Sequence, residues 1–188
     1  MSDSGNVRGF VILSRIDFIR RRWGDEGLER VLDRLPDRDR EMLSGTVIAA
    51  GWYGFDLSQR LDVAIAAEAN RGSAVYRELG AASAEDNLLS TAQRSFLRAR
   101  TPHALLEQAQ ALHPLYYDTG RSEYERRGES SAVVRTHGCA SRSEADCATV
   151  CGWLEKAITM SAGRQPRVVE TSCSARGAEF CEYECSWE

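Results

Sequence analysis

The periodicity of apolar residues changes once along this chain, near residue 120, and that change constrains the fold more than any other feature. Before it, apolar residues recur three and four positions apart, as Leu28, Val31, Leu32 and Leu35 do, which predicts one face of a helix. After Gly120, short segments rich in Val, Thr and Tyr predict strands instead. The chain is therefore expected to have a helical part followed by a sheet.

Residues 1–120 are expected to be mainly helical. One helix should end near Gly24 and the next should stop at Pro36. The segment around Trp52 is ambiguous between a short strand and a turn. Three helix starts are predicted from residues that commonly cap helices: Asp56, the pair Ser83 and Asp86, and Thr101 followed by Pro102.

Residues 121–188 predict the element order β-β-α-β-β. Strands are expected over 122–127 and 130–137, joined around Gly128, and over 167–172 and 179–187. Between the pairs lies an amphipathic helix over 143–160. This order predicts an α+β fold whose antiparallel sheet is covered on one face. A chain of 188 residues suits a single domain, residues 1–188.

Composition excludes several classes of protein. The net charge of −4 gives no basic footprint for nucleic acid. The polar N-terminus shows no signal peptide, and every apolar stretch is shorter than the roughly 18 residues that a membrane span needs. A cytoplasmic location is therefore expected. In a reducing cytosol the six cysteines should be free or metal-bound rather than paired.

The last predicted hairpin brings two cysteines together. Cys173 and Cys181 each lie four residues from Gly177, so a turn at this glycine places them opposite each other. Opposed Cβ atoms about 4.5–5.5 Å apart suit a shared metal and are also near disulfide range. A third interpretation is that the cysteines are small core residues. Cys185 shares their face, whereas Glu170 joins them only if a bulge breaks the strand.

The pattern E-x-x-C-x7-C, together with a helix that opens at Cys147, resembles the 4-vinyl-reductase-type domain of aromatic-responsive bacterial activators. This resemblance covers about residues 110–187. It implies a structural zinc ion held by Cys147, Glu170, Cys173 and Cys181. Four other side chains are substitutes for any one ligand: Cys139, Cys151, Cys185 and His137.

The whole chain is similar to a paralogous myxobacterial family of unknown function, through segments such as "GWYGF", "LYYDTGR" and "CGWLEKAI". The wider fold group implied by this likeness includes nitric-oxide-binding haem domains and Golgi vesicle-tethering subunits, whose helices and sheet can enclose an apolar ligand. Tyr117, Thr119 and Arg121 mimic the haem-propionate clamp of the former. His103 and His113 lie too close before Tyr117 to match the iron ligand, so haem is the less expected cofactor.

No catalytic motif is visible: there is no G-x-S-x-G, P-loop or G-x-G-x-x-G. We therefore expect a non-catalytic regulatory or sensory module that binds a small hydrophobic or aromatic ligand, a protein partner, or both, and forms a homodimer. The alternative is a protein-interaction scaffold without a small ligand. The expected pocket lining, whose other interpretation is ordinary core packing, is Trp52, Tyr53, Phe55, Tyr116, Tyr117 and Trp153.

Overall fold

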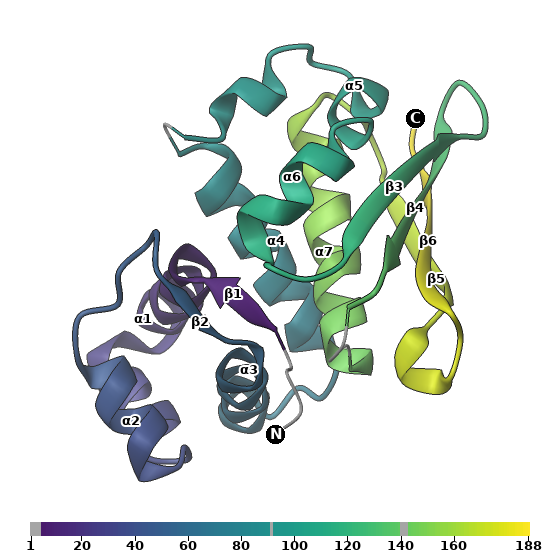
Figure 1. Cartoon of the computed structure of the whole chain (residues 1–188). Helices are drawn as coiled ribbons and strands as arrows, with labels where there is room; N and C mark the ends of the chain where they lie inside the picture. Colours follow the sequence, from purple (N-terminus) through teal and green to yellow (C-terminus); the bar gives the residue numbers. More distant parts are fainter. Residues whose placement is uncertain (1–4, 91, 140–142) are drawn as a thin grey trace.

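The computed structural model describes residues 5–90, 92–139 and 143–188. Helices gather at the N-terminal side, and a twisted sheet forms the opposite edge of the molecule (Figure 1). The helical part contains β1 (Asn6–Arg8), α1 (Gly9–Leu32), α2 (Asp37–Ser44), β2 (Trp52–Gly54), α3 (Phe55–Ala69), α4 (Ala74–Leu88), the 3-10 turn η1 (Arg94–Leu97), α5 (Pro102–Leu106) and α6 (Ala109–Tyr116). The sheet part contains β3 (Arg121–Arg126), β4 (Ser131–His137), α7 (Glu144–Met160), β5 (Arg167–Ser172), the 3-10 turn η2 (Ser174–Arg176) and β6 (Phe180–Ser186). The mixed α+β class predicted from periodicity is confirmed.

The first long helix, α1, is broken where the sequence predicts a helix end. Gly24 has φ 69° and ψ −170°, so the helix continues only after a kink at this residue. A positive φ of this kind is strained for residues with a Cβ, which explains the glycine. The two expected helices therefore run into each other across Gly24 and end before Pro36.

One of the three predicted helix starts is confirmed. Thr101 caps α5, where its side chain accepts from the N–H of Ala104 at 3.3 Å, and Pro102 is the first helical residue. The prediction for Asp56 is wrong by two residues, because α3 begins after Gly54 and Asp56 lies in its first turn.

The predicted start at Ser83 and Asp86 is also wrong, since both residues lie inside α4. That helix begins at Ala74 because its earlier turns carry buried apolar side chains, Val75 and Leu79, which belong to the core of the helical part. Tertiary packing overrides a capping pattern that is only local.

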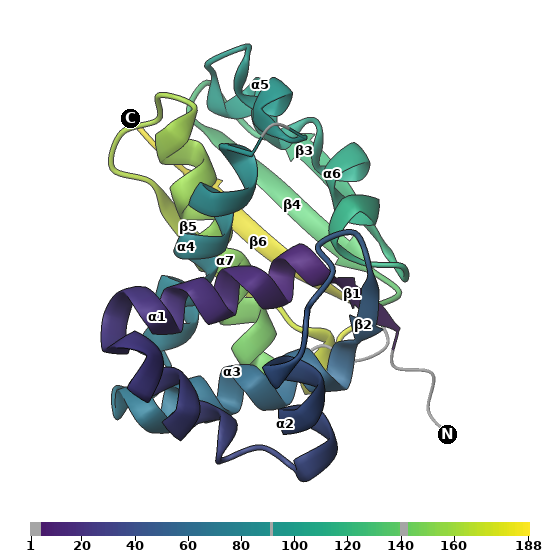
Figure 2. The same cartoon turned by 90° about the vertical axis from the view of Figure 1, so that its left-hand side faces the viewer.

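The sheet is antiparallel throughout and has the order β3-β4-β6-β5. The connection through α7 carries the chain from β4 to the outer strand β5, and β6 then returns between them. Figures 1 and 2 show the helices on one face of this sheet. β1 and β2 form a separate two-stranded sheet on the helical part, and β1 was not predicted.

Two glycines allow α4 and α7 to pack backbone against backbone. A Cβ on Gly80 would lie 1.9 Å from the carbonyl oxygen of Thr149, and one on Gly152 would lie 2.0 Å from that of Arg77. Trp153 follows directly in α7 and packs against each of the three hydrophobic clusters formed by the described residues. This contact therefore joins the helical part to the sheet. Within the described ranges, no helix has the length and apolar character needed to cross a membrane.

Candidate ligand cavity and thiol cluster

Four side chains from three elements meet at one end of the sheet. Cys147 lies in the first turn of α7, Glu170 in β5, Cys173 just after β5, and Cys181 in β6. The Sγ atom of Cys147 is 3.7 Å from that of Cys173 and 3.6 Å from that of Cys181. One ligand atom from each of the four residues lies within 4.8 Å of the others. We call this group the thiol cluster.

Local backbone features position the thiol cluster. The pairing of β5 with β6 shifts register between Glu170 and Ser172. This is the break in the strand that Glu170 needs in order to lie on the same side as the cysteines. Gly177 has φ 90° and closes the turn between Cys173 and Cys181. On the other side, a reciprocal capping box between Ser143 and Asp146 starts α7, so that Cys147 faces the sheet.

The sulfur separations indicate what the cluster can bind. A disulfide would need about 2.05 Å between sulfurs, so these thiols are not paired. Sulfurs bound to one tetrahedral ion at about 2.3 Å lie roughly 3.8 Å apart, close to the separations from Cys147. The backbone N–H of Ser174 also approaches the Cys181 sulfur at 3.3 Å. The geometry therefore suits thiolates that share a cation.

The carboxylate of the cluster lies between an arginine and the thiols. Glu170 Oε2 accepts from Arg176 at 3.1 Å, and the carboxylate also interacts with the thiols of Cys147 and Cys173. A hydrogen bond to Cys181, and then burial, raise the pKa of the Cys147 thiol far above its ordinary range. Without a cation the Cys147 thiol therefore keeps its proton, whereas a bound cation would favour its thiolate.

The substitute ligands lie outside this group. Cys151 and Cys185 are buried in the core between α7 and the sheet, where burial raises their pKa values to about 11 and about 12. His137 pairs with Glu123 at 3.2 Å on the outer side, and Cys139 is only partly buried. The structure thus brings together the four residues that the 4-vinyl-reductase resemblance implied, and not their substitutes.

A cavity of about 100 Å³ lies between the helices and the inner face of the sheet. Most of its wall is apolar. It is lined by Val11 and Arg15 of α1, Ser83 of α4, Leu105 and Leu106 of α5, Ala109, Leu112, His113 and Tyr116 of α6, Tyr117, Ser122 of β3, Val134 and Thr136 of β4, and Thr149, Val150, Trp153 and Leu154 of α7. Three of the six predicted lining residues, Tyr116, Tyr117 and Trp153, are among them.

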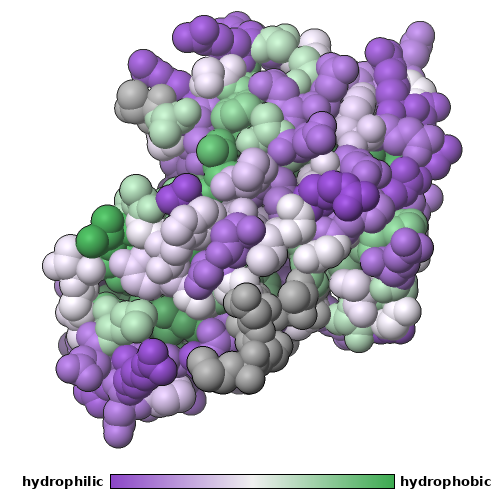
Figure 3. Space-filling model, viewed as in Figure 1, coloured by the Kyte–Doolittle hydropathy of each residue, from purple (hydrophilic) through white to green (hydrophobic). Residues whose placement is uncertain are grey.

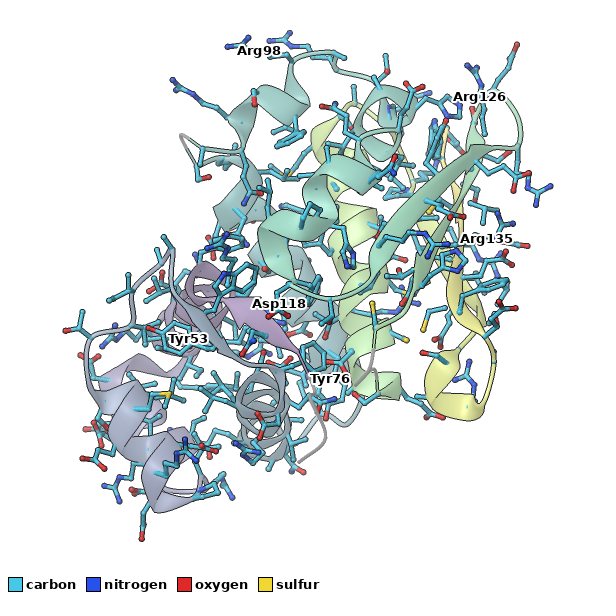
Figure 4. The ribbon with its side chains drawn as sticks, in the orientation of Figure 1. Tyr53, Tyr76, Arg98, Asp118, Arg126 and Arg135 are labelled. Atoms are coloured by element: carbon cyan, nitrogen blue, oxygen red, sulfur yellow. The ribbon has the colours of Figure 1, made fainter. Side chains whose placement is uncertain are left out.

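Trp52, Tyr53 and Phe55 do not line the cavity, so the prediction for these three residues is wrong. Trp52 is 40% exposed and lies under the guanidinium of Arg8. Tyr53, labelled in Figure 4, lies on the helical part, where its hydroxyl accepts from the N–H of Ile48. Phe55 is in the core of the helical part. The cause is the pairing of β2 with β1, which holds this segment away from the main sheet.

Two polar side chains line the cavity without having been predicted as part of its lining. Arg15 is buried and forms an ion pair with Asp62 through Nε at 3.0 Å and Nη2 at 3.3 Å. Burial raises the pKa of Asp62, and its bonds to Arg15 oppose that rise. The signal was present as a cation inside the apolar run "FVILSRIDFI", where an unpaired charge would be costly.

The second feature is the side chain of His113, whose ring nitrogens are both bonded to the protein. Nδ1 bonds to the hydroxyl of Ser122 at 2.9 Å, and Nε2 to the carbonyl oxygen of Thr119 at 2.9 Å. A carbonyl only accepts, so Nε2 carries a proton. The imidazole is thus held beside the cavity with both ring nitrogens bonded to the protein.

Comparison with solved structures identifies the fold as that of H-NOX proteins. A mutant H-NOX protein from K. algicida in the Fe(II) unliganded state is similar over 96% of each chain, with 12% identity and a TM-score of 0.74. An H-NOX protein from S. oneidensis in the Fe(II)NO state is similar over 96% of this chain and 99% of its own, with 12% identity and a TM-score of 0.74. An oxygen-binding H-NOX domain related to soluble guanylate cyclases is similar over 96% of this chain and 95% of its own, with 12% identity and a TM-score of 0.69. The sequence matches no protein-family model and no curated protein.

These neighbours contradict the prediction of a zinc cofactor. Several neighbours of this fold are described with Fe(II) or haem, and those compared above are not described with zinc. The zinc prediction is therefore wrong as the cofactor of this fold. It followed from a resemblance confined to residues 110–187, whereas the structural likeness extends over nearly the whole chain.

Haem, which this fold implies, does not fit the residues present. Both nitrogens of His113 are engaged by the protein. Those of His103 bond to the Tyr124 hydroxyl and the Glu129 carbonyl, outside the cavity. Arg121, the third member of the clamp-like set, points outward to Glu123. A cavity of about 100 Å³ is also small beside the roughly 300–1,000 Å³ of pockets for larger ligands.

We accordingly expect purified protein to bind no haem. After incubation with one equivalent of hemin and gel filtration, the protein fraction should show no stoichiometric Soret band near 400 nm (roughly where haem absorbs). His113→Ala should leave the spectrum unchanged, because that ring is not an iron ligand. A stoichiometric band that disappears in His113→Ala would contradict this expectation.

Proposed function

We propose that this chain is a non-catalytic sensory module that binds one small apolar molecule directly, in the cavity between the helices and the sheet. The observation that carries the proposal is the cavity itself, with apolar walls supplied by both parts of the fold. Related folds are described with nitric oxide and oxygen as ligands. The likeness supports a small-molecule site at a comparable place, without an intervening haem.

The size of the cavity limits its ligand. A dry apolar cavity of about 150 Å³ in another protein admits benzene or xenon. A cavity of about 100 Å³ therefore suits a molecule somewhat smaller than benzene. Because α1, α4, α6 and α7 all contribute to the wall, occupancy would favour the arrangement in which they pack together. This is how binding could be transmitted to a partner or to a second copy of the chain.

We further propose the thiol cluster as a binding site for a thiophilic metal ion, with no particular metal assigned. The sulfur separations of 3.6 and 3.7 Å support this, as does the position of the Glu170 carboxylate within 4.8 Å of the three sulfurs. The positive charge of Arg176 beside Glu170 would offset part of the negative charge of the ligands. The same convergence supports the resemblance of the sheet part to the 4-vinyl-reductase-type domain. The bound metal ion would have a structural role, because it would hold α7 against the hairpin of β5 and β6.

The cavity proposal predicts that the protein takes up dissolved xenon. The ¹²⁹Xe resonance should shift in proportion to the wild-type protein concentration, because xenon exchanges with a dry apolar site. Ala109→Met should abolish the concentration-dependent shift by filling the cavity, since Ala109 lines it. The matched control is Ala49→Met, at an exposed loop position away from the cavity.

Equal xenon shifts in wild type and Ala109→Met would contradict the proposal. A cavity that takes up no xenon would instead favour the alternative function, a protein-interaction scaffold that binds its partner through its surface. In the face shown in Figure 3, apolar residues appear as separate patches within a largely hydrophilic surface.

A further inference from the structure

The segment over residues 87–106 contains three arginines, Arg94, Arg98 and Arg100, and no aspartate or glutamate. It is therefore locally basic in a chain whose net charge is −4. All three arginines are exposed, and none makes an ion pair or a side-chain hydrogen bond with another described residue. Arg98, labelled in Figure 4, projects from the ribbon into solvent. We call these three arginines and the neighbouring Leu89 the basic patch.

The most obvious basic run of the sequence is, by contrast, neutralised in the structure. Arg20, Arg21 and Arg22 of α1 each pair with a carboxylate, at 3.1, 2.8 and 2.7 Å respectively. Exposed ion pairs of this kind add little stability, but each cancels the local field that an approaching anion would meet. The basic patch has no such carboxylates, so its positive potential stays available to an anionic group.

Short turns hold the basic patch in place. The backbone N–H of Arg94 closes a turn at 2.9 Å, and those of Arg98 and Arg100 close the two turns that follow, at 3.2 Å each. Gln93 is buried next to them and accepts from the hydroxyl of Tyr116 at 3.0 Å. Because the backbone of the segment is ordered before binding, a partner that docks here loses less conformational entropy.

The basic patch is supported by side chains of the cavity wall. Phe96 and Leu97, which lie between the arginines, pack against the cluster that contains Leu105 and Leu112. Both of these leucines line the cavity, as does Tyr116. A partner on the basic patch would therefore contact a surface that rests directly on the proposed ligand site.

We infer that the basic patch docks an acidic segment of a protein partner, whose carboxylates pair with the three arginines and whose apolar side chain covers Leu89. Leu89 follows the last turn of α4 and is 61% exposed, so an apolar contact is available beside the charges. The planar fork of an arginine matches a carboxylate with two parallel hydrogen bonds. This inference goes beyond the proposed function, because docking does not require an occupied cavity.

The basic patch suits a protein segment better than a bilayer or a nucleic acid. Sites that hold anionic lipid by charge commonly contain about four to eight basic residues, and the apolar side chains between these arginines are engaged with the core. Binding to nucleic acid depends on neutralising many phosphates, which the negative net charge of the chain opposes. A contact with a few carboxylates needs only the groups present.

The test uses a fluorescein-labelled synthetic peptide that has glutamates on both sides of a leucine, with binding to the full chain measured by fluorescence anisotropy. Affinity should fall as the ionic strength rises from about 0.1 M to about 1 M, because the screening length shortens from about 10 Å to about 3 Å. The triple variant Arg94→Gln, Arg98→Gln, Arg100→Gln should bind roughly tenfold more weakly, since three exposed ion pairs are lost. A peptide with serine in place of leucine should bind wild type roughly threefold more weakly.

The matched control is the triple variant Arg30→Gln, Arg40→Gln, Arg71→Gln. It removes the same charge from arginines that are about equally exposed and already paired with carboxylates. Its affinity for the peptide should stay within about twofold of wild type, because exposed charges beyond the screening length interact little. Circular dichroism of both variants should match wild type, since every substitution is at the surface.

Equal affinities of the two triple variants would overturn this inference, as would a peptide that does not bind wild type at about 0.1 M ionic strength. Phosphatidylglycerol-containing vesicles and a DNA duplex are the competing probes. Tighter binding of wild type to either of them than to the peptide would assign the basic patch to another class of partner and overturn it too.

Spectra of wild type decide the question even if a variant folds poorly. The arginine Nε–H resonances of the basic patch should shift when the peptide is added, and their failure to shift would contradict docking at this place. None of these measurements involves the cavity, so a negative result leaves the proposed function intact.

Discussion

Replacing Gly152 with alanine is expected to lower the free energy of unfolding by about 3 kcal/mol, at the upper end of the usual cost of overpacking. The added Cβ would lie 2.0 Å from the carbonyl oxygen of Arg77. That oxygen belongs to the backbone of α4, so α4 and α7 must move apart as whole helices. The gain in helix propensity from glycine to alanine, about 1 kcal/mol, offsets only part of the cost. Urea unfolding followed by far-UV circular dichroism measures the difference.

Gly45→Ala is the control for this substitution. Gly45 has φ −84°, and the nearest atoms to an added Cβ are at 3.5 and 3.7 Å, so alanine fits without strain. Its effect should stay within about 0.5 kcal/mol. If the two variants unfold at the same urea concentration, α4 and α7 do not pack as closely as the structure shows.

Cys181→Ser should lower the free energy of unfolding by at least about 3 kcal/mol, because it removes one sulfur ligand of the thiol cluster and places a hydroxyl in an apolar site. Cys181 is fully buried and lies 3.6 Å from the sulfur of Cys147. Elemental analysis of wild-type protein purified without added metal should find about one thiophilic ion per chain, as expected for a single four-ligand site. Cys181→Ser should lose that ion.

Cys139→Ser serves as the matched control and should change stability by no more than about 0.5 kcal/mol. Cys139 is only partly buried, and its thiol contacts the carbonyl oxygen of His137, which a serine hydroxyl can also do. Small and equal losses for both variants, in protein that contains no metal, would show that the cluster consists of ordinary reduced core cysteines.

Much of the secondary structure was predictable because it depends on local patterns. The strand pair 122–127 and 130–137 and the helix over 143–160 match β3, β4 and α7 to within one residue at each end. The predicted starts at Asp56 and Ser83 failed for a physical reason. Capping preferences are worth only about 1 kcal/mol, and packing of apolar side chains over a whole helix exceeds that.

The two parts of the site differed in how far the sequence could predict them. The thiol cluster depends on short-range features, namely the turn at Gly177 and the break after Glu170, and its fourth member came from the family resemblance. The cavity depends on long-range contacts. Trp52 and Tyr116 are both aromatic residues next to strand or turn signals. The pairing of β2 with β1 directs Trp52 outward, whereas Tyr116 lines the cavity.

The amino-acid sequence by itself determined the order of helices and strands, the positions of the chain breaks at Gly24 and Gly177, and the facing of Cys173 and Cys181. These follow from backbone sterics and from side-chain periodicity within a few residues. The tertiary structure decided that β6 inserts between β4 and β5, that α4 and α7 meet through Gly80 and Gly152, and that Trp153 lines the cavity between the helices and the sheet. Such contacts join residues far apart in the chain, and their energies depend on the packing of the whole molecule rather than on any local pattern.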